Sequence, residues 1–137
     1  MRKRVATCVC GQLSASCSGD PAQVSLCHCL ACQLRTGSTY DIAAFFARVY
    51  VILAGDAKTY TRSSDSGYPV TFHFCPNCGS TVYWMPDPKP EMVAVAVGPW
   101  PIRPYLRRLK QSMLNTGADG FWGRQVRGII SLGLRRA

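Results

Sequence analysis

Apolar and polar residues alternate in short runs over the first 98 positions, without a 3.6-residue period. The runs at 4–10 and 12–18 are rich in Val, Thr and Ser and meet at Gly11, which predicts a hairpin. Further strand-like runs lie at 22–29, 41–53, 58–62, 70–74, 80–85 and 92–97. The longest, 41–53, predicts a bent strand or two strands that meet near Arg48. The predicted fold class is therefore mainly β, with many short strands.

A helical pattern occurs in two places. One helical turn is predicted over residues 30–35, where Gly37 would stop it. Farther along, residues 105–115 place four apolar side chains roughly on one side of a helix, after three closely spaced prolines. We therefore expect a folded domain over residues 1–98 and a C-terminal tail over residues 99–137 that is helical in part or disordered.

The net charge of +9 is carried mostly by that tail. Residues 99–137 contain eight basic side chains and one acidic one, whereas residues 1–98 contain eight basic and six acidic ones. Because the positive charge does not cover a folded face, we do not expect nucleic acid as a partner. No stretch approaches the roughly 18 uncharged apolar residues of a membrane-spanning helix, so we expect no membrane partner either.

Eight cysteines in 137 residues are the most unusual feature of the composition. They could form four disulfides in an exported protein or bind metal in a reducing compartment. The basic start and the short apolar run within residues 2–13 resemble an export signal only weakly, because Gln12 interrupts the run. We therefore expect a cytoplasmic protein whose clustered cysteines bind metal.

Two cysteine pairs suit a closed metal site. Cys8 and Cys10 are two residues apart, so both would project from the same face of a strand. Cys75 and Cys78 have the spacing of a zinc knuckle. Together the pairs offer four thiolates for a tetrahedral zinc that would clip the N-terminal hairpin to the strands around residue 77. We expect this four-cysteine cluster to be structural, because ion binding would be coupled to folding in so small a domain.

The segment from Cys27 to Cys32 offers one ligand fewer. Cys27 and Cys29 would share a strand face, and Cys32 would return from the following turn. Three thiolates leave one coordination position of a zinc open, which is typical of catalytic sites. They also leave a formal charge of minus one, which favours holding an incoming sulfur as a thiolate over generating hydroxide. This three-cysteine cluster therefore indicates a thiol cosubstrate.

Three motifs, in this order, resemble those of a known family. They are Cys8-Val9-Cys10-Gly11, Cys27-His28-Cys29-Leu30-Ala31-Cys32 with Arg35-Thr36-Gly37-Ser38 after it, and Phe74-Cys75-Pro76-Asn77-Cys78-Gly79-Ser80. Over residues 4–98 the chain resembles the glutathione-dependent formaldehyde-activating enzymes (GFA), whose domain also occurs in centromere protein V. The resemblance implies a tent-like β fold of short antiparallel strands, shared with Mss4-type zinc proteins. Beyond Gly98 the chain departs from the family pattern, because a basic tail replaces an acidic, aromatic ending.

The resemblance also implies two zinc ions and an activity. The implied ligands are Cys8, Cys10, Cys75 and Cys78 for a structural zinc, and Cys27, Cys29 and Cys32 for a catalytic zinc. The implied enzyme is a carbon–sulfur lyase of the S-(hydroxymethyl)glutathione synthase type, which condenses formaldehyde with glutathione. The expected partners are therefore glutathione, or another small thiol, and an aldehyde.

Two alternatives remain open from the residues themselves. The three-cysteine cluster could be a second structural zinc site completed by His28 or Cys17. However, His28 should point away from its neighbours on a strand, and Cys17 suits a small core residue. The domain could instead be a non-catalytic zinc-binding module whose basic tail contacts nucleic acid or an acidic protein. Three further interpretations are structural: a strand histidine at His73, a solvated helix-end cation at Arg35, and sheet packing for Tyr83 and Trp84.

Overall fold

The computed structural model describes residues 1–87 and 89–100. Within them, the strands in chain order are β1 (Lys3–Thr7), β2 (Ser14–Ser18), β3 (Gln23–Cys27), β4 (Asp41–Ala47), β5 (Val51–Ala54), β6 (Lys58–Ser63), β7 (Pro69–Phe74), β8 (Thr81–Pro86) and β9 (Met92–Ala96). The helix α1 (Leu30–Thr36) lies between β3 and β4, and its C-cap is Gly37, as predicted. The mainly β class predicted from the sequence is confirmed.

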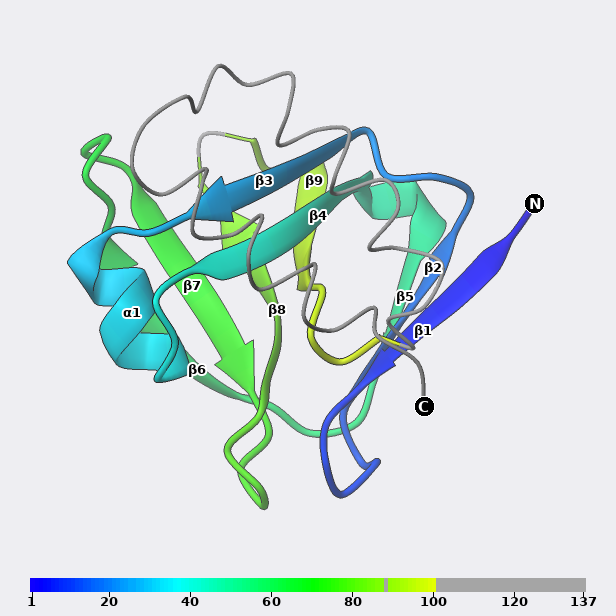
Figure 1. The fold of residues 1–137 in the computed structure, drawn as a ribbon. Helices are drawn as coiled ribbons and strands as arrows, with labels where there is room; N and C mark the ends of the chain where they lie inside the picture. The colour runs from blue at the N-terminus through cyan, green and yellow to red at the C-terminus, as the bar shows by residue number, and fades with distance from the viewer. Residues whose placement is uncertain (88, 101–137) are drawn as a thin grey trace, which may run out of the picture. The chain divides into compact units, whose positions relative to one another are not determined.

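The strands form two antiparallel sheets (Figure 1). The three-stranded sheet has the order β1-β2-β5, and the six-stranded sheet has the order β3-β4-β9-β8-β7-β6. The pairing of β1 with β2 runs from Lys3 opposite Ser18 to Thr7 opposite Ser14, which confirms the predicted N-terminal hairpin.

The long apolar run at 41–53 crosses from one sheet to the other. β4 ends at Ala47, a 3-10 turn follows at Arg48–Tyr50, and β5 then joins the smaller sheet. The backbone N–H of Arg48 donates to the carbonyl of Glu91 at 2.7 Å. Its side-chain Nη1 donates to the carbonyl of Val51 at 2.9 Å. The predicted break near Arg48 is confirmed, and these hydrogen bonds hold the bend between the sheets.

One apolar row crosses the six-stranded sheet. Phe72 lies opposite Trp84 between β7 and β8, and Trp84 lies opposite Ala94 between β8 and β9. The buried cluster on this face consists of Ala43, Phe72, Trp84, Ala94 and Ala96, with Phe45 and Val70 packed against it. β9 is buried at four of its five positions, which explains its continuous apolar sequence.

The packed body extends to the last described residue. The ring of Trp100 meets that of Phe46 edge-on, with centroids 5.8 Å apart. The backbone N–H of Thr7 donates to the carbonyl of Pro99 at 3.4 Å. The predicted helix over 105–115 lies outside the described residues. Within the described part of the chain, no helix is long and apolar enough to cross a membrane.

Candidate metal centres

Four of the eight cysteines meet between two hairpin turns. Cys8 and Cys10 lie in the turn between β1 and β2, and Cys75 and Cys78 lie in the turn between β7 and β8. All four sulfur atoms lie within 4.8 Å of one another. The Sγ of Cys10 is 3.5 Å from that of Cys8 and 3.6 Å from that of Cys75. The structure thus brings together all residues of the four-cysteine cluster, two from a turn of the three-stranded sheet and two from a turn of the six-stranded sheet.

The local geometry of Cys8 and Cys10 differs from the prediction. β1 ends at Thr7, so neither cysteine lies on a strand. Instead, the N–H of Cys8 donates to the carbonyl of Leu13 at 2.9 Å, and its carbonyl accepts the N–H of Gly11 at 3.0 Å. The two sulfurs converge because this turn bends the chain back on itself, and the two-residue period of a strand plays no part.

Two polar side chains outside the predicted ligand set contact this cluster. Gln12 Nε2 donates to Cys75 Sγ at 3.1 Å. The same carboxamide binds the backbone carbonyl and N–H of Asp56 at 2.8 and 3.1 Å. The Oγ of Ser80 lies 3.3 Å from Cys78 Sγ. The contact of Ser80 could have been predicted from its position two residues after Cys78. No feature of the local sequence predicts the contact of Gln12 with Cys75.

The donors around Cys78 stabilise the ionised form of its sulfur. The pKa of Cys78 falls to about 5, chiefly because the hydroxyl and then the backbone N–H of Ser80 donate to its sulfur. The backbone N–H of Leu13 also donates to Cys8 Sγ at 3.2 Å. With this pKa, Cys78 is ionised at neutral pH. The turn therefore presents it as a thiolate, which is the form that binds metal.

The three-cysteine cluster is built from one continuous segment. Cys27 is the last residue of β3, Cys29 is the N-cap of α1, and Cys32 lies in the first turn of α1. Their sulfur atoms lie within 4.8 Å of one another. Cys27 is exposed, Cys29 is half-buried and Cys32 is buried. The expectation that Cys27 and Cys29 share a strand face is wrong, because the strand ends at Cys27 and the strand-to-helix turn brings the sulfurs together.

The two residues considered as a fourth ligand lie outside this cluster. Among residues 1–87 and 89–100, no other His, Cys, Asp or Glu has a ligand atom within 4.8 Å of all three sulfurs. His28 is exposed. Cys17 is fully buried in β2, and burial raises its pKa to about 11, so it remains a thiol at neutral pH. The prediction of Cys17 as a core residue is confirmed.

The surroundings of Cys32 and Cys29 act on their pKa values in opposite directions. Burial, and then the neighbouring sulfurs, raise the pKa of Cys32 to about 12. The backbone N–H of Cys32 donates to Cys29 and lowers the pKa of that thiol. A buried thiol beside other sulfurs is costly to ionise unless a cation replaces its proton. This donor set therefore suits a bound cation better than three free thiolates.

Both sulfur sets fit a thiophilic ion. Tetrahedral zinc with Zn–S distances of about 2.3 Å would place its sulfur ligands about 3.8 Å apart. The separations of 3.5 and 3.6 Å in the four-cysteine cluster need little adjustment to reach that value. Thiolate ligands select soft or borderline ions, among them Zn²⁺. Both clusters could therefore bind a metal ion, and their donors are consistent with zinc.

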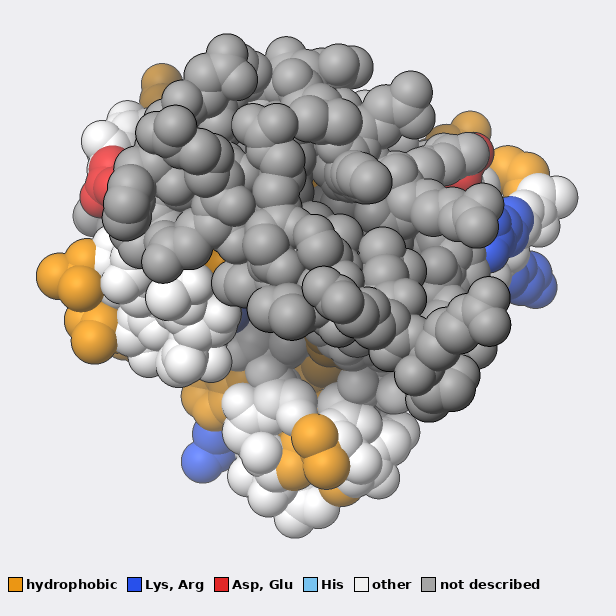
Figure 2. Space-filling view, in the orientation of Figure 1, with side chains coloured by type: hydrophobic (Ala, Val, Ile, Leu, Met, Phe, Trp, Pro, Cys, Tyr) orange, Lys and Arg blue, Asp and Glu red, His pale blue; other side chains and the backbone are white. Residues whose placement is uncertain are grey.

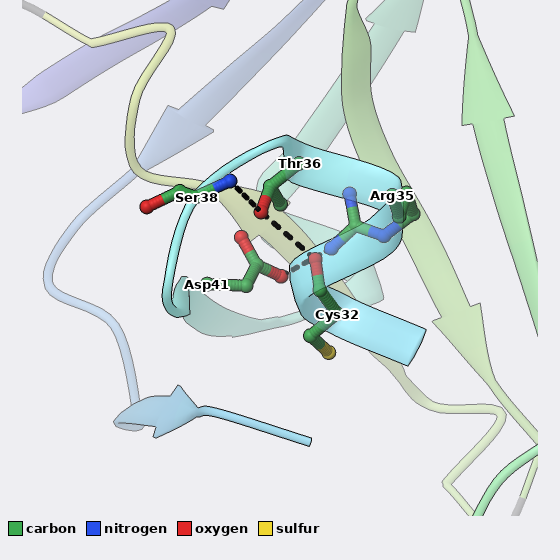
Figure 3. Close-up of polar contacts among 5 residues, drawn as sticks. All are labelled: Cys32, Arg35, Thr36, Ser38 and Asp41. Carbon is green, nitrogen blue, oxygen red and sulfur yellow. Dashed lines mark hydrogen bonds and ion pairs between the residues drawn. The ribbon is translucent and has the colours of Figure 1, made fainter. Parts of the chain in front are cut away.

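Arg35 is not the solvated cation that the sequence suggested. Its side chain is 17% exposed and forms an ion pair with Asp41 (Figure 3). Its guanidinium carbon lies 4.5 Å from the ring centroid of Phe72. Cys32 precedes Arg35 by one helical turn on α1, so this packed cation lies on the same helix as a residue of the three-cysteine cluster.

His73 and its neighbours lie within the six-stranded sheet. The ring of His73 stacks on that of Tyr83 with centroids 4.5 Å apart, and burial lowers the pKa of His73. Tyr83 and Trp84 are both buried, which confirms the prediction that they pack in the sheet. None of these three residues belongs to either cysteine cluster.

The sequence model of the glutathione-dependent formaldehyde-activating enzyme family matches residues 3–110. The chain belongs to this family. The match continues beyond residue 98, where we expected the family pattern to end. No curated protein matches this GFA-family chain significantly. A structural-genomics crystal structure of a Rhodobacter sphaeroides protein is similar to it, with 22% sequence identity and a TM-score of 0.53 over 69% of this chain and 85% of that chain. That likeness concerns the fold alone.

Proposed function

We propose that this GFA-family chain is a zinc-dependent carbon–sulfur lyase of the S-(hydroxymethyl)glutathione synthase type. It would act on adducts of glutathione, or of another small thiol, with formaldehyde or another aldehyde. Family membership supports this substrate class. The observation that carries the chemistry is the three-cysteine cluster, whose sulfurs converge without a fourth protein ligand among the described residues.

We assign different roles to the two clusters. The four-cysteine cluster would hold a structural zinc, because it supplies a full tetrahedral set and joins Cys10 to Cys75 across 65 residues of sequence. The three-cysteine cluster would hold a catalytic zinc, because it supplies only three ligands and so leaves one coordination position open. A substrate thiol can reach an exposed, incomplete coordination sphere but not a complete one.

The residues of the three-cysteine cluster have distinct tasks. When bound there, zinc would supply the positive charge that keeps an incoming thiol ionised at neutral pH. Cys32, whose pKa is raised by burial, gives up its proton when the cluster is loaded. The backbone N–H of Cys32 lowers the pKa of Cys29, which favours its ionised form. Cys27, at the exposed end, forms the edge that the substrate approaches.

Metal-to-protein stoichiometry of the wild type and of Cys29→Ser tests this assignment. We expect about two zinc ions per chain in the wild type and about one in the variant, with the fold retained, because the lost ion is the one at the open site. Circular dichroism and thermal unfolding report the fold, and turnover of glutathione with formaldehyde should be lost. Loss of the fold in Cys29→Ser would mean that this ion is structural.

The alternative is a non-catalytic zinc module whose basic tail contacts nucleic acid or an acidic protein. Cobalt substitution separates the two functions. A cobalt spectrum that shifts when glutathione is added supports the enzyme. Two inert ions, together with salt-sensitive DNA binding by the full chain, would support the module instead.

A further inference from the structure

The helix that carries Cys32 has little apolar surface to hold it in place. α1 has seven residues, which is too short for a stable isolated helix, and Cys32 is its only buried residue. Leu30 and Leu34 are 69% and 76% exposed. Figure 2 shows exposed apolar side chains at the edge that α1 occupies in Figure 1. Contacts other than apolar burial must therefore fix this helix against the sheet.

An ion pair joins α1 to the strand that follows it. Nη2 of Arg35 donates to the carboxylate of Asp41, the first residue of β4 (Figure 3). Asp41 lies directly opposite Cys27 in the pairing of β3 with β4. Arg35 follows Cys32 by one helical turn. The pair thus connects the helix that carries one sulfur to the strand pair that carries another.

Two aromatic rings contact the same guanidinium. Its central carbon lies 4.5 Å from the ring centroid of Phe72 and 5.1 Å from that of Trp84. These rings are opposite each other on β7 and β8, with centroids 5.5 Å apart. A planar guanidinium can lie against aromatic rings and bind a carboxylate at once, which a lysine ammonium cannot reproduce. Arg35 therefore ties α1 to β4, β7 and β8.

Burial distinguishes this ion pair from an ordinary surface contact. The side chains of Arg35 and Asp41 are 17% and 12% exposed. Removing one partner would leave a poorly solvated charge, which costs much more than breaking an exposed pair. The hydroxyl of Thr36 adds to the arrangement: it donates to the carbonyl of Cys32 at 2.8 Å and accepts the N–H of Ser38 at 3.1 Å.

We infer that the Arg35–Asp41 pair positions the three-cysteine cluster by setting the separation between the sulfurs of Cys27 and Cys32, so that both reach the same ion. This role rests on the proposed function only in requiring an ion at that cluster, and it does not depend on the reaction. Neither Arg35 nor Asp41 belongs to the cluster, so both act through the cysteines.

Cobalt titration of the full chain tests this role, because thiolate-to-cobalt absorption reports each site without any substrate. Asp41→Asn removes the charge and keeps the size of the side chain. We expect the affinity of the three-cysteine cluster for Co²⁺ to fall roughly 10- to 100-fold, while the four-cysteine cluster binds as in the wild type.

A matched control breaks the other ion pair of the described residues. Arg4 of β1 binds Asp20 at 2.5 Å, and the side chains of Arg4 and Asp20 are 10% and 55% exposed. In Asp20→Asn, both cobalt affinities should stay within about twofold of the wild type, because neither residue belongs to a cysteine cluster and Arg4 still donates to the carbonyl of Gly19.

Two further variants separate positioning from loss of the fold. Arg35→Lys keeps the positive charge but removes the planar guanidinium that lies against the two rings. We expect the Co²⁺ affinity of the three-cysteine cluster alone to fall roughly tenfold. Arg35→Gln combined with Asp41→Asn leaves no unpaired charge, so this double variant should fold even if Asp41→Asn alone does not. The loss of cobalt affinity in the double variant should be smaller than the sum of the losses in Arg35→Gln alone and in Asp41→Asn alone.

The outcomes decide the inference and the proposed function separately. Equal weakening of both clusters in Asp41→Asn, or unchanged cobalt binding, overturns the positioning role. A wild type that binds one ion overturns both. Two ions in the wild type and a selective loss in Asp41→Asn, without any response to glutathione, would support the positioning role and contradict the proposed reaction.

Discussion

The two cysteine clusters use the same ligand type but connect the chain differently. The four-cysteine cluster joins two turns, so that Cys10 and Cys75 meet across 65 residues of sequence. The three-cysteine cluster takes all its sulfurs from residues 27–32. Closing a long loop restricts the unfolded chain more than closing a short one. An ion at the four-cysteine cluster would therefore contribute mainly to folding, whereas an ion at the three-cysteine cluster would be free to take part in chemistry.

The surroundings of the clusters differ as well. Sulfurs of the four-cysteine cluster accept hydrogen bonds from the side chain of Gln12 and the backbone of Leu13, and Ser80 contacts another. Near the three-cysteine cluster, the Arg35–Asp41 ion pair connects α1, which carries Cys32, to β4, which pairs with the strand of Cys27. Donors thus act directly on sulfurs of the four-cysteine cluster, whereas the Arg35–Asp41 pair acts through the helix and the strand pair that carry Cys32 and Cys27.

The largest effect is expected from breaking the closed cluster in Cys75→Ser. Loss of a structural zinc removes roughly 10 kcal/mol of binding free energy that is coupled to folding. This loss is comparable to the whole stability of a domain, about 5–15 kcal/mol. We therefore expect no cooperative thermal transition in Cys75→Ser, whereas Cys29→Ser should keep one. Near-UV circular dichroism on heating measures both, and a wild-type transition in Cys75→Ser would remove the distinction between the clusters.

A smaller effect is expected at Gly55, where the β5–β6 connection approaches the turn of the four-cysteine cluster. Its φ is +94°, and an added Cβ would lie 1.8 Å from the backbone oxygen of Gln12. Gly55→Ala should therefore cost on the order of 3 kcal/mol in urea unfolding, because both the backbone conformation and the space oppose it.

Gly67→Ala is the matched control for that loss. Its φ is +85°, but nothing lies within 4 Å of the added Cβ. It should lose only the backbone contribution, about 1 kcal/mol. Equal losses of stability in Gly55→Ala and Gly67→Ala would show that the close approach to Gln12 has no energetic importance.

The smallest effect is expected in Gln12→Leu, which keeps the bulk of the side chain but removes the donor to Cys75. The two hydrogen bonds to Asp56 that are lost as well are exposed, so water replaces them. The free energy of unfolding should fall by about 1 kcal/mol. The ion at the four-cysteine cluster should be released to a chelator at a roughly tenfold lower concentration, with the other ion unaffected. Chelator titration followed by metal analysis measures this, and simultaneous release of both ions would contradict a local role for Gln12.

Local sequence patterns were sufficient where neighbouring residues decide the structure. The hairpin at the N-terminus, the helical turn before Gly37 and the break near Arg48 each depend on residues close in sequence, and all three were predicted correctly. The pairing of cysteines two residues apart was misinterpreted as strand geometry. A tight turn after Thr7 and a helix cap at Cys29 also bring such sulfurs together, and spacing alone does not distinguish these arrangements.

Contacts between distant residues could not be predicted in the same way. Arg35 was interpreted as a solvated cation because its position at the end of a short helix is typical of one. Its aromatic neighbours, Phe72 and Trp84, lie on strands of another hairpin. Gln12 has no local feature that indicates a bond to Cys75.

By itself, the sequence indicated which neighbouring cysteines can share an ion, because ligand spacing is a property of short segments. The tertiary structure decided that Cys8 and Cys10 meet Cys75 and Cys78. Only the tertiary structure decided which side chains surround those sulfurs and which sulfur remains exposed. The physical reason is that these contacts arise from strand register and from the packing of α1 on the six-stranded sheet, which bring together residues far apart in the chain.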